Sequence, residues 1–372
     1  MRFSSTIIIF SFILSFQSSF GQVYSFKDDI RLDALPVISQ DRTGTCWSYS
    51  TTSFLESEIM RKTGKQINLS EMYPVRQSYL LKAENYIYRQ GKAQFDEGAL
   101  GHDIINSMEK FGLMPADAFT GLELGTNTHN HREMVEVMKA VLNAYIKDPS
   151  QRLSNKWKTV LPFILDAYLG TYPKEFMFDG NKYTPETFKK MTTLSGSDYV
   201  TLTSFTHVPF YTNTILSIPD NFSNGSMYNV PLEVLTQVVD NALANGFTIA
   251  LDCDVSEPTF SAKHGIAVIP ANTSDSEAIL SEIKPEIKVD QSYRQNEFEA
   301  LTTTDDHLMH IVGTVKDQKG NVYYKVKNSW GNNPERVGNN GFIYMSKPYF
   351  QLKTISILLH RDGLLTEIKS KI

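Results

Sequence analysis

The apolar pattern of this sequence changes its period near residue 247, and that change limits the folds open to the chain. Before it, apolar side chains recur at helical spacing in the segments 46–60, 69–89, 98–111 and 232–243. After it, β-branched and aromatic residues gather in short runs at 247–255, 266–269, 310–315, 322–326, 341–345 and 354–359. Helices first and strands last predict an α+β fold with two segregated lobes.

The composition is that of an ordinary globular protein of 372 residues, with 41% hydrophobic and 21% charged residues. The net charge of −5 and the pI near 5.9 disfavour a broad surface for polyanions, because such a surface needs clustered Lys and Arg. We therefore expect no nucleic-acid partner.

The first 21 residues form a distinct segment of the sequence. Met1-Arg2 is followed by an apolar run at 6–16 and then by small and polar residues up to Gly21. This order is typical of a secretory signal peptide. A membrane anchor is the alternative, but the apolar run is well short of the roughly 20 residues that span a bilayer. We predict a signal peptide at 1–21, a single mature domain at 22–372, and export to the periplasm or the exterior without a membrane anchor.

Two cysteines are present, and export would allow Cys46 and Cys253 to form a disulfide. A loop that contains Gly44 leads Cys46 into the first turn of the predicted helix. Free backbone N–H groups and the helix dipole stabilise a thiolate there, so the position suits a reactive cysteine. A buried structural cysteine is the ordinary alternative, and this observation alone leaves both open.

A predicted β-hairpin supplies partners for such a cysteine. If its turn centres near Lys319, antiparallel pairing places His310 opposite Asn328, because opposite positions then sum to about 638. An Asn carbonyl at that place can hold the orientation of an imidazole. The pattern thus predicts that His310 and Asn328 meet at one end of the hairpin.

The remaining histidines offer alternatives. His307 competes with His310 for the role of the base, and two histidines at this spacing also raise the question of a metal site. No cysteine and no second histidine pair at ligand spacing accompanies them, so we expect no metal and no cofactor. His264 and His102 have the ordinary interpretation of structural histidines.

Two flanking residues fit the same chemistry. Trp330 follows Asn328 closely, and an indole there can shield an Asn–His hydrogen bond from water, although a core tryptophan is the ordinary interpretation. Gln40 lies six residues before Cys46, where an amide can donate to a developing oxyanion. A glutamine in a loop indicates nothing by itself.

In order, spacing and flanking residues, these motifs resemble the papain superfamily of cysteine peptidases. The similarity is closer to the bleomycin hydrolase and aminopeptidase C branch, and it extends from about Leu35 to His360. The segments that carry it are Gln40 with Cys46-Trp47; Leu69-Ser70 with Glu84-Asn85-Tyr86; Gly98-Ala99 with Asp103 and Glu109-Lys110; Tyr228-Asn229-Val230-Pro231-Leu232-Glu233; Asp252-Cys253-Asp254-Val255; His310; and Asn328-Ser329-Trp330-Gly331.

The resemblance implies a papain-like fold and an aminopeptidase that hydrolyses peptide substrates through a thioester acyl-enzyme. It implies Cys46 as nucleophile, His310 as base and acid, Asn328 as the orienting residue and Gln40 as the oxyanion donor. It further implies a homo-oligomer, which is a hexamer in that branch. The residues that it places at the substrate groove are Gly98, Ala99 and Trp330.

Several features depart from the papain pattern. The separation of Cys46 and His310 is 310 − 46 = 264 residues, against about 130–150 for papain-like enzymes, and a mostly helical insertion at about 120–238 accounts for the excess. Ala99 replaces a glycine that faces the substrate backbone, so we expect its methyl group to narrow the groove. In the resembled branch a C-terminal arm enters the active site, and its carboxylate restricts cleavage to N-terminal residues.

Here the segment 363–372 is shorter and more basic than that arm. A less restricted endopeptidase therefore stays an alternative to an aminopeptidase. A non-catalytic binding protein with a papain-like fold is another alternative, although it would be expected to have lost the Cys, the His or the Asn. A transferase with the same triad logic would normally carry Asp in place of the Asn-Ser-Trp motif.

Overall fold

The computed structural model describes residues 24–122, 126–147 and 154–372. The predicted signal peptide lies outside these residues and stays a prediction. Within the described part of the chain, no helix is long and apolar enough to cross a membrane.

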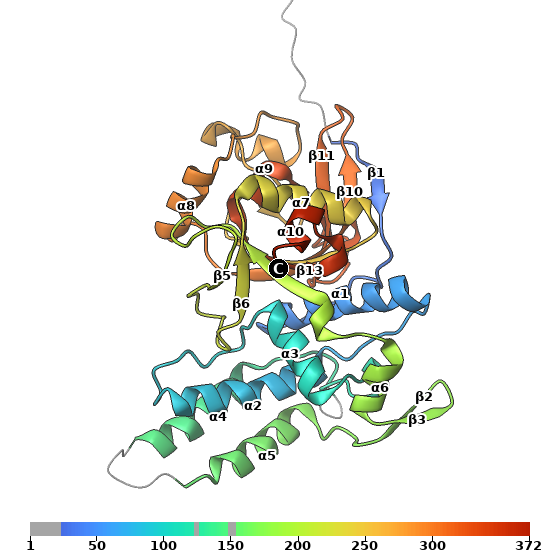
Figure 1. The fold of residues 1–372 in the computed structure, drawn as a ribbon, viewed down its shortest axis with the longest axis vertical. Coiled ribbons are helices and arrows are strands. Elements are labelled where there is room, and N and C mark those ends of the chain that lie inside the picture. Colours follow the sequence, from blue (N-terminus) through green and yellow to red (C-terminus); the bar gives the residue numbers. More distant parts are fainter. Residues whose placement is uncertain (1–23, 123–125, 148–153) are drawn as a thin grey trace, which may run out of the picture.

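The first part of the chain forms a helical lobe. Its three leading helices begin and end within three residues of the predicted bounds: α1 (Cys46–Thr63), α2 (Met72–Tyr88) and α3 (Gly101–Phe111). Three more helices complete it: α4 (Arg132–Ile146), α5 (Trp157–Leu169) and α6 (Pro185–Thr192). Figure 1 shows α2 to α6 gathered on one side of α1.

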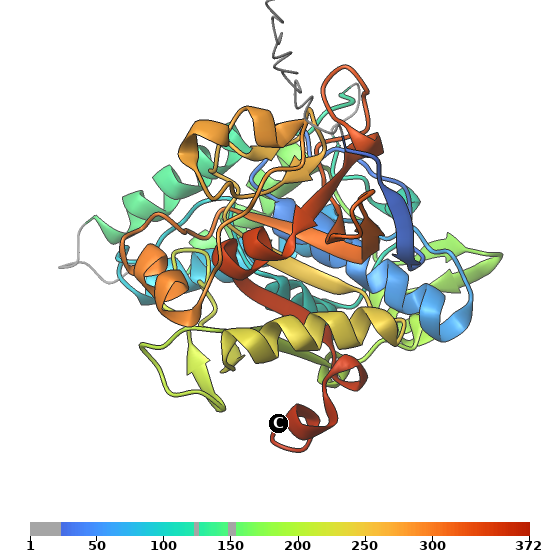
Figure 2. The same ribbon diagram turned by 90° about the horizontal axis from the view of Figure 1, so that it is seen from above.

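The second part is built on a large sheet, whose strands lie in the order β5-β6-β4-β13-β7-β10-β11-β12-β9-β8, with β1 paired to β10. Most pairs are antiparallel, whereas β4 with β6 and β9 with β12 are parallel. The bounds are β1 (Lys27–Arg31), β4 (Tyr199–Thr203), β5 (Thr212–Ile215), β6 (Ser226–Asn229), β7 (Ile249–Cys253), β8 (Phe260–Ser261), β9 (Ile266–Ala267), β10 (His307–Lys316), β11 (Val322–Lys327), β12 (Phe342–Ser346) and β13 (Thr354–His360). Helices α7 (Leu232–Ala244), α8 (Gln291–Glu299), α9 (Lys347–Lys353) and α10 (Thr366–Lys369) flank this sheet (Figure 2).

This architecture confirms the predicted α+β fold. The segment at 120–238 is more varied than expected, because besides α4 to α6 it contains the small hairpin β2 (Phe176–Phe178) and β3 (Asn181–Tyr183), and also β4 to β6 of the large sheet. Its origin as an insertion stays a prediction.

Helix α1 packs between the two lobes. It contacts β10 and β7 on one side and α2 and α3 on the other, and every residue from Cys46 to Met60 is buried. A helix surrounded in this way shows little amphipathic pattern. Its many small Ser and Thr residues let neighbouring elements approach closely, and Ser50 and Ser57 bond backbone carbonyls outside the helix.

The hairpin of β10 and β11 forms around the predicted turn, but its register shifts part of the way along. Near the turn, opposite positions sum to 638, as in Gly313 with Lys325. A β-bulge between Ile311 and Gly313 then adds one residue to β10, so that His310 lies opposite Lys327. The predicted pairing of His310 with Asn328 is therefore wrong, because one inserted residue reverses the faces on which side chains meet.

Candidate active site

Cys46 is the first residue of α1, as predicted. The preceding Thr45 makes no side-chain cap, and the first turn of the helix carries no acidic residue. The thiol is buried, which raises the pKa of Cys46 to about 12, while a hydrogen bond from the backbone N–H of Leu308 lowers it. Both cysteines are free, so the alternative disulfide with Cys253 is not formed.

The imidazole that accompanies this thiol belongs to His307. Nε2 of His307 lies 2.7 Å from Oδ1 of Asn328, and the ring of Trp330 packs over the imidazole with 4.9 Å between centroids. Burial lowers the pKa of His307 to about 4, and the bond to Asn328 raises it. Because Leu308 follows His307 and donates to the thiol, Cys46 and His307 are neighbours.

His310 points to the opposite face of β10, as an odd separation along a strand requires. Its Nδ1 lies 3.0 Å from the hydroxyl of Ser53 on α1, and Lys327 donates to the same hydroxyl at 2.7 Å. Burial and the charge of Lys327 hold the pKa of His310 well below its usual value. His310 is thus an interior residue, which corrects its predicted place beside Asn328. A glycine inside the strand, Gly313, was the available sign of a bulge.

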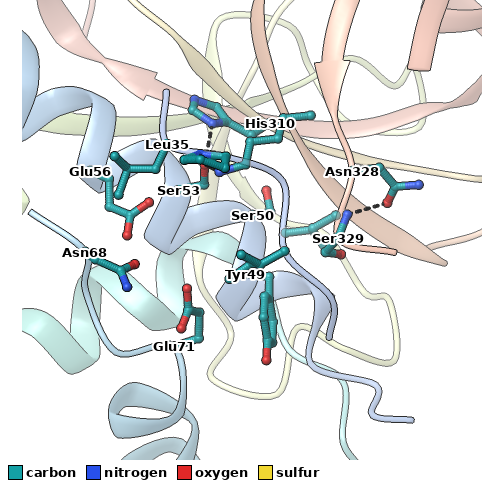
Figure 3. A pocket seen from close by; sticks show the side chains of 14 residues that line it. Leu35, Tyr49, Ser50, Ser53, Glu56, Asn68, Glu71, His310, Asn328 and Ser329 are labelled. Atoms are coloured by element: carbon teal, nitrogen blue, oxygen red, sulfur yellow. Dashed lines mark hydrogen bonds between the residues drawn. The ribbon is translucent and has the colours of Figure 1, made fainter. Parts of the chain in front are cut away.

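A hollow of about 340 Å³ lies on the His310 side of the hairpin (Figure 3). Glu56, Glu71 and Lys327 line it. Burial raises the pKa of Glu56 to about 8 and that of Glu71 to about 7, and Lys327 lowers both. Its rim includes the exposed residues Pro36, Ile38 and Asn68, so the hollow opens to the surface. Asn328 lines it as well, whereas among the described residues neither Cys46 nor His307 does.

Gln40 is held against the segment that carries Asn328. Its backbone N–H donates to the carbonyl of Ser329 at 2.8 Å, and its Oε1 accepts a bond of 2.6 Å from the Ser329 hydroxyl. Its Nε2 donates to the carbonyl of Thr43 at 2.6 Å, which leaves the second amide hydrogen for another acceptor. Gln40 therefore joins the loop before Cys46 to the end of β11.

The groove wall at Gly98 and Ala99 differs from the expectation. Ala99 is completely buried, so its methyl group is not what narrows the groove. Instead the carboxylate of Asp220 lies against Gly98, where a Cβ atom would stand 2.0 Å from Oδ2. Glu97, which precedes Gly98, also contacts the residues on either side of Cys46. Its carboxylate accepts a hydrogen bond of 2.6 Å from the Gly44 N–H, and its backbone carbonyl accepts one of 3.0 Å from the Trp47 indole.

The last ten residues of the sequence pack against the β lobe. Leu364 and Ile368 are buried there, and the Lys371 ammonium lies 4.1 Å from the centroid of the Tyr211 ring. Ile372 lines a hollow of about 400 Å³ together with residues that include His102, and of the described residues neither Cys46 nor His307 is among them. Elsewhere in the described chain, no three His, Cys, Asp or Glu side chains are arranged to hold a metal ion.

Comparison with known proteins adds a family and a fold. A model described as the Peptidase C1-like family matches residues 164–372, and one described as papain family cysteine protease matches residues 27–77. The chain is 24% identical to aminopeptidase G of Lactobacillus delbrueckii subsp. lactis, over 88% of this chain and 81% of the relative. It is 21% identical to aminopeptidase C of Listeria innocua, over 92% and 83%. The crystal structure of PepW from Lactobacillus rhamnosis superposes with a TM-score of 0.70 at 18% identity, over 93% of this chain and 84% of that one.

Proposed function

Since this chain belongs to the Peptidase C1-like family and is a cysteine-type peptidase, we propose that it is an aminopeptidase with Cys46 as nucleophile and His307 as base. The observation that carries the proposal is the 2.7 Å contact between His307 and Asn328, directly beside a cysteine at a helix N-terminus. The contact also supports Asn328 as the orienting residue.

The tautomer of His307 follows from that contact. An amide oxygen accepts, so Nε2 of His307 carries a hydrogen and Nδ1 is left as the base, to which we assign the proton of the thiol. Burial favours a neutral thiol and a neutral imidazole, so we assign the proton transfer to the attack itself. Trp330 covers the imidazole and keeps water from the bond to Asn328.

Catalysis then proceeds by acyl transfer. Nδ1 of His307 takes the proton from Cys46 as sulfur attacks the scissile carbonyl carbon. The free amide hydrogen of Gln40 and the N–H groups at the start of α1 stabilise the oxyanion. His307 returns the proton to the leaving amine, which departs and leaves a thioester. Water, activated by the same imidazole, hydrolyses the thioester and restores the thiol.

Similarity to aminopeptidases G and C over most of both chains supports exopeptidase activity on N-terminal residues. The decisive test uses aminoacyl-coumarin amides beside their N-acetylated forms. We expect faster hydrolysis of the free aminoacyl substrates and inactivation by iodoacetamide. Equal or faster hydrolysis of the acetylated forms would identify an endopeptidase instead.

The role of Cys46 is tested in the same assay. Cys46→Ala should abolish turnover without lowering the melting temperature, whereas the matched variant Cys253→Ala should stay active, because Cys253 is buried in the core of the β lobe. Full activity of Cys46→Ala would refute the proposed nucleophile.

A further inference from the structure

The connection between β5 and β6, residues 216–225, forms a fixed loop at one end of the groove. Asn221 holds its shape, because Nδ2 donates to the carbonyls of Leu216 at 3.0 Å and Gly225 at 3.1 Å, while Oδ1 accepts from Gly225 N–H at 2.7 Å. Leu216 and Phe222 anchor it in the helical core. The position of Asp220 at its centre is thus well defined.

One side of this loop lies against the helical lobe. The Asp220 carboxylate accepts a bond of 3.2 Å from Gln94 and occupies the space that a side chain at Gly98 would need. His102 contacts the hydroxyl of Ser223 at 3.1 Å. Asp220 can approach the groove wall this closely only because residue 98 is a glycine.

The other side of the loop faces two acids of the β lobe. Asp305 lies two residues before His307, and Asp252 lies on β7 opposite Leu308. Asp220 touches Gly98, and the neighbouring Glu97 bonds Gly44 and Trp47 on either side of Cys46. In keeping with this, the charges of Asp220, Asp305 and Asp252 all raise the pKa of Cys46. The loop therefore reaches from Gly98 of the helical lobe to Asp305 of the β lobe.

Few hydrogen-bond donors reach these acids. Asp252 is 2% exposed, and only one of its oxygens has a donor, the Ser356 hydroxyl at 3.2 Å. Its Oδ1 and both buried oxygens of Asp305 receive no hydrogen bond of ordinary geometry. The Asp252 and Asp305 carboxyl groups interact directly, and the Asp220 N–H approaches Asp305. Burial raises the pKa of all three acids. Buried acceptors without donors are costly, so a cationic donor would be bound favourably here.

A protein cation offsets only part of this charge. Lys82 is buried, donates to the carbonyl of Gly98, and interacts electrostatically with Asp220. The three acids therefore keep an excess of acceptors over donors.

We propose that Asp220 determines specificity by accepting the α-ammonium group of the substrate's N-terminal residue, with Asp305 and Asp252 completing an acidic end to the groove. This deepens the proposed aminopeptidase function and rests on it. An ammonium supplies three donors, whereas an acetylated N-terminus has one uncharged donor and a methyl group that would meet the loop. The side chain of Ile372 packs against the core of the β lobe, and this selection does not depend on it.

The test compares kcat/KM for aminoacyl-coumarin and N-acetyl-aminoacyl-coumarin substrates in wild type, Asp220→Asn and Asp220→Ala. Loss of a charge-assisted bond should lower the ratio of free to acetylated hydrolysis about 10- to 100-fold. The ratio is taken within one preparation, so partial misfolding does not affect it. Asp117→Asn, at an exposed acid of the helical lobe, is the matched control and should keep the wild-type ratio.

The outcomes separate this inference from the proposed function. A wild-type enzyme without preference for free N-termini would refute the aminopeptidase itself. A wild-type preference that survives in both Asp220 variants would refute only the role of Asp220. If the variants instead lose activity on acetylated substrates with a Lys or Arg side chain, the acids recognise a basic side chain and the inference is wrong. Deleting Ser370 to Ile372 should leave the ratio of free to acetylated hydrolysis unchanged. A large fall of this ratio in the deletion variant would show that the C-terminal segment selects for free N-termini.

Discussion

At the scale of single residues, the two histidines of β10 show that burial alone does not make an imidazole a catalytic base. Burial lowers the pKa of both imidazoles. His307 precedes Leu308, whose N–H bonds the thiol, and Asn328 fixes the tautomer of its imidazole, which leaves Nδ1 as a base. His310 projects toward α1 and bonds a serine hydroxyl, with the charge of Lys327 close by. A proton on His310 would be repelled there.

This contrast predicts different losses in two alanine variants. His307→Ala should lower kcat by about 10³-fold, within the usual range for loss of a general acid and base, besides the stability cost of removing a buried imidazole that packs against Trp330. His310→Ala should keep kcat within a few-fold but lower the free energy of unfolding by about 2 kcal/mol, because it leaves Ser53 and Lys327 around a new cavity. Steady-state kinetics with active-site titration measures kcat, and urea denaturation measures the free energy of unfolding. A 10³-fold loss of kcat in well-folded His310→Ala would contradict the assignment.

At the scale of elements, the bulge in β10 decides which face of the strand carries each side chain. Val312 is the added residue, and Gly313 follows it at the position where β10 pairs with Arg31 of the antiparallel strand β1. A Cβ atom on Gly313 would stand 2.0 Å from the carbonyl oxygen of Ile30. The bulge thus depends on the approach of β1, which belongs to a distant part of the sequence.

Replacing this glycine should therefore be costly. Gly313→Ala should lower the free energy of unfolding by about 3 kcal/mol, since the backbone of β1 must move to admit the methyl group. Gly320→Ala is the matched control, because Gly320 has a φ of +85° in the turn with open space around its Cβ position. It should cost only about 1 kcal/mol, from backbone conformation alone. Equal costs in urea denaturation would show that the contact with Ile30 does not constrain the bulge.

At the scale of the whole molecule, the site is assembled from both lobes around α1. Cys46 comes from α1, His307 from β10 and Asp220 from the β5–β6 connection (Figure 1). The end of the sequence belongs to the same framework, since Ile368 packs into the core that contains α7. Deleting residues 363–372 would thus remove core side chains and would test folding as much as specificity.

Single substitutions in this segment separate the two effects. Ile368→Ala should lower the free energy of unfolding by about 2–4 kcal/mol, as expected for truncation of a buried aliphatic side chain, without changing the preference for free N-termini. Glu367→Ala, at the neighbouring exposed position, should be nearly neutral in both respects. A changed preference in folded Ile368→Ala would indicate that the tail takes part in substrate selection.

The sequence by itself determined the features that depend on local pattern. Apolar periodicity predicted α1 and α7, β-branched runs predicted β11 and β13, and a glycine loop before a helix predicted the position of Cys46. These features follow from neighbours within a few residues, because helical and extended periods are set by backbone geometry. The α+β class follows from their order.

Only the tertiary structure decided which histidine accompanies Asn328. The choice depends on one bulge residue, whose place is set by the packing of β1 against β10, and a shift of one residue moves a side chain to the other face. The same holds for Asp220, which lies 220 − 46 = 174 residues from Cys46 in the sequence and comes to the helical lobe because the β5–β6 loop packs against Gly98. Contacts between such distant segments come from the packing of the two lobes and leave no local period in the sequence.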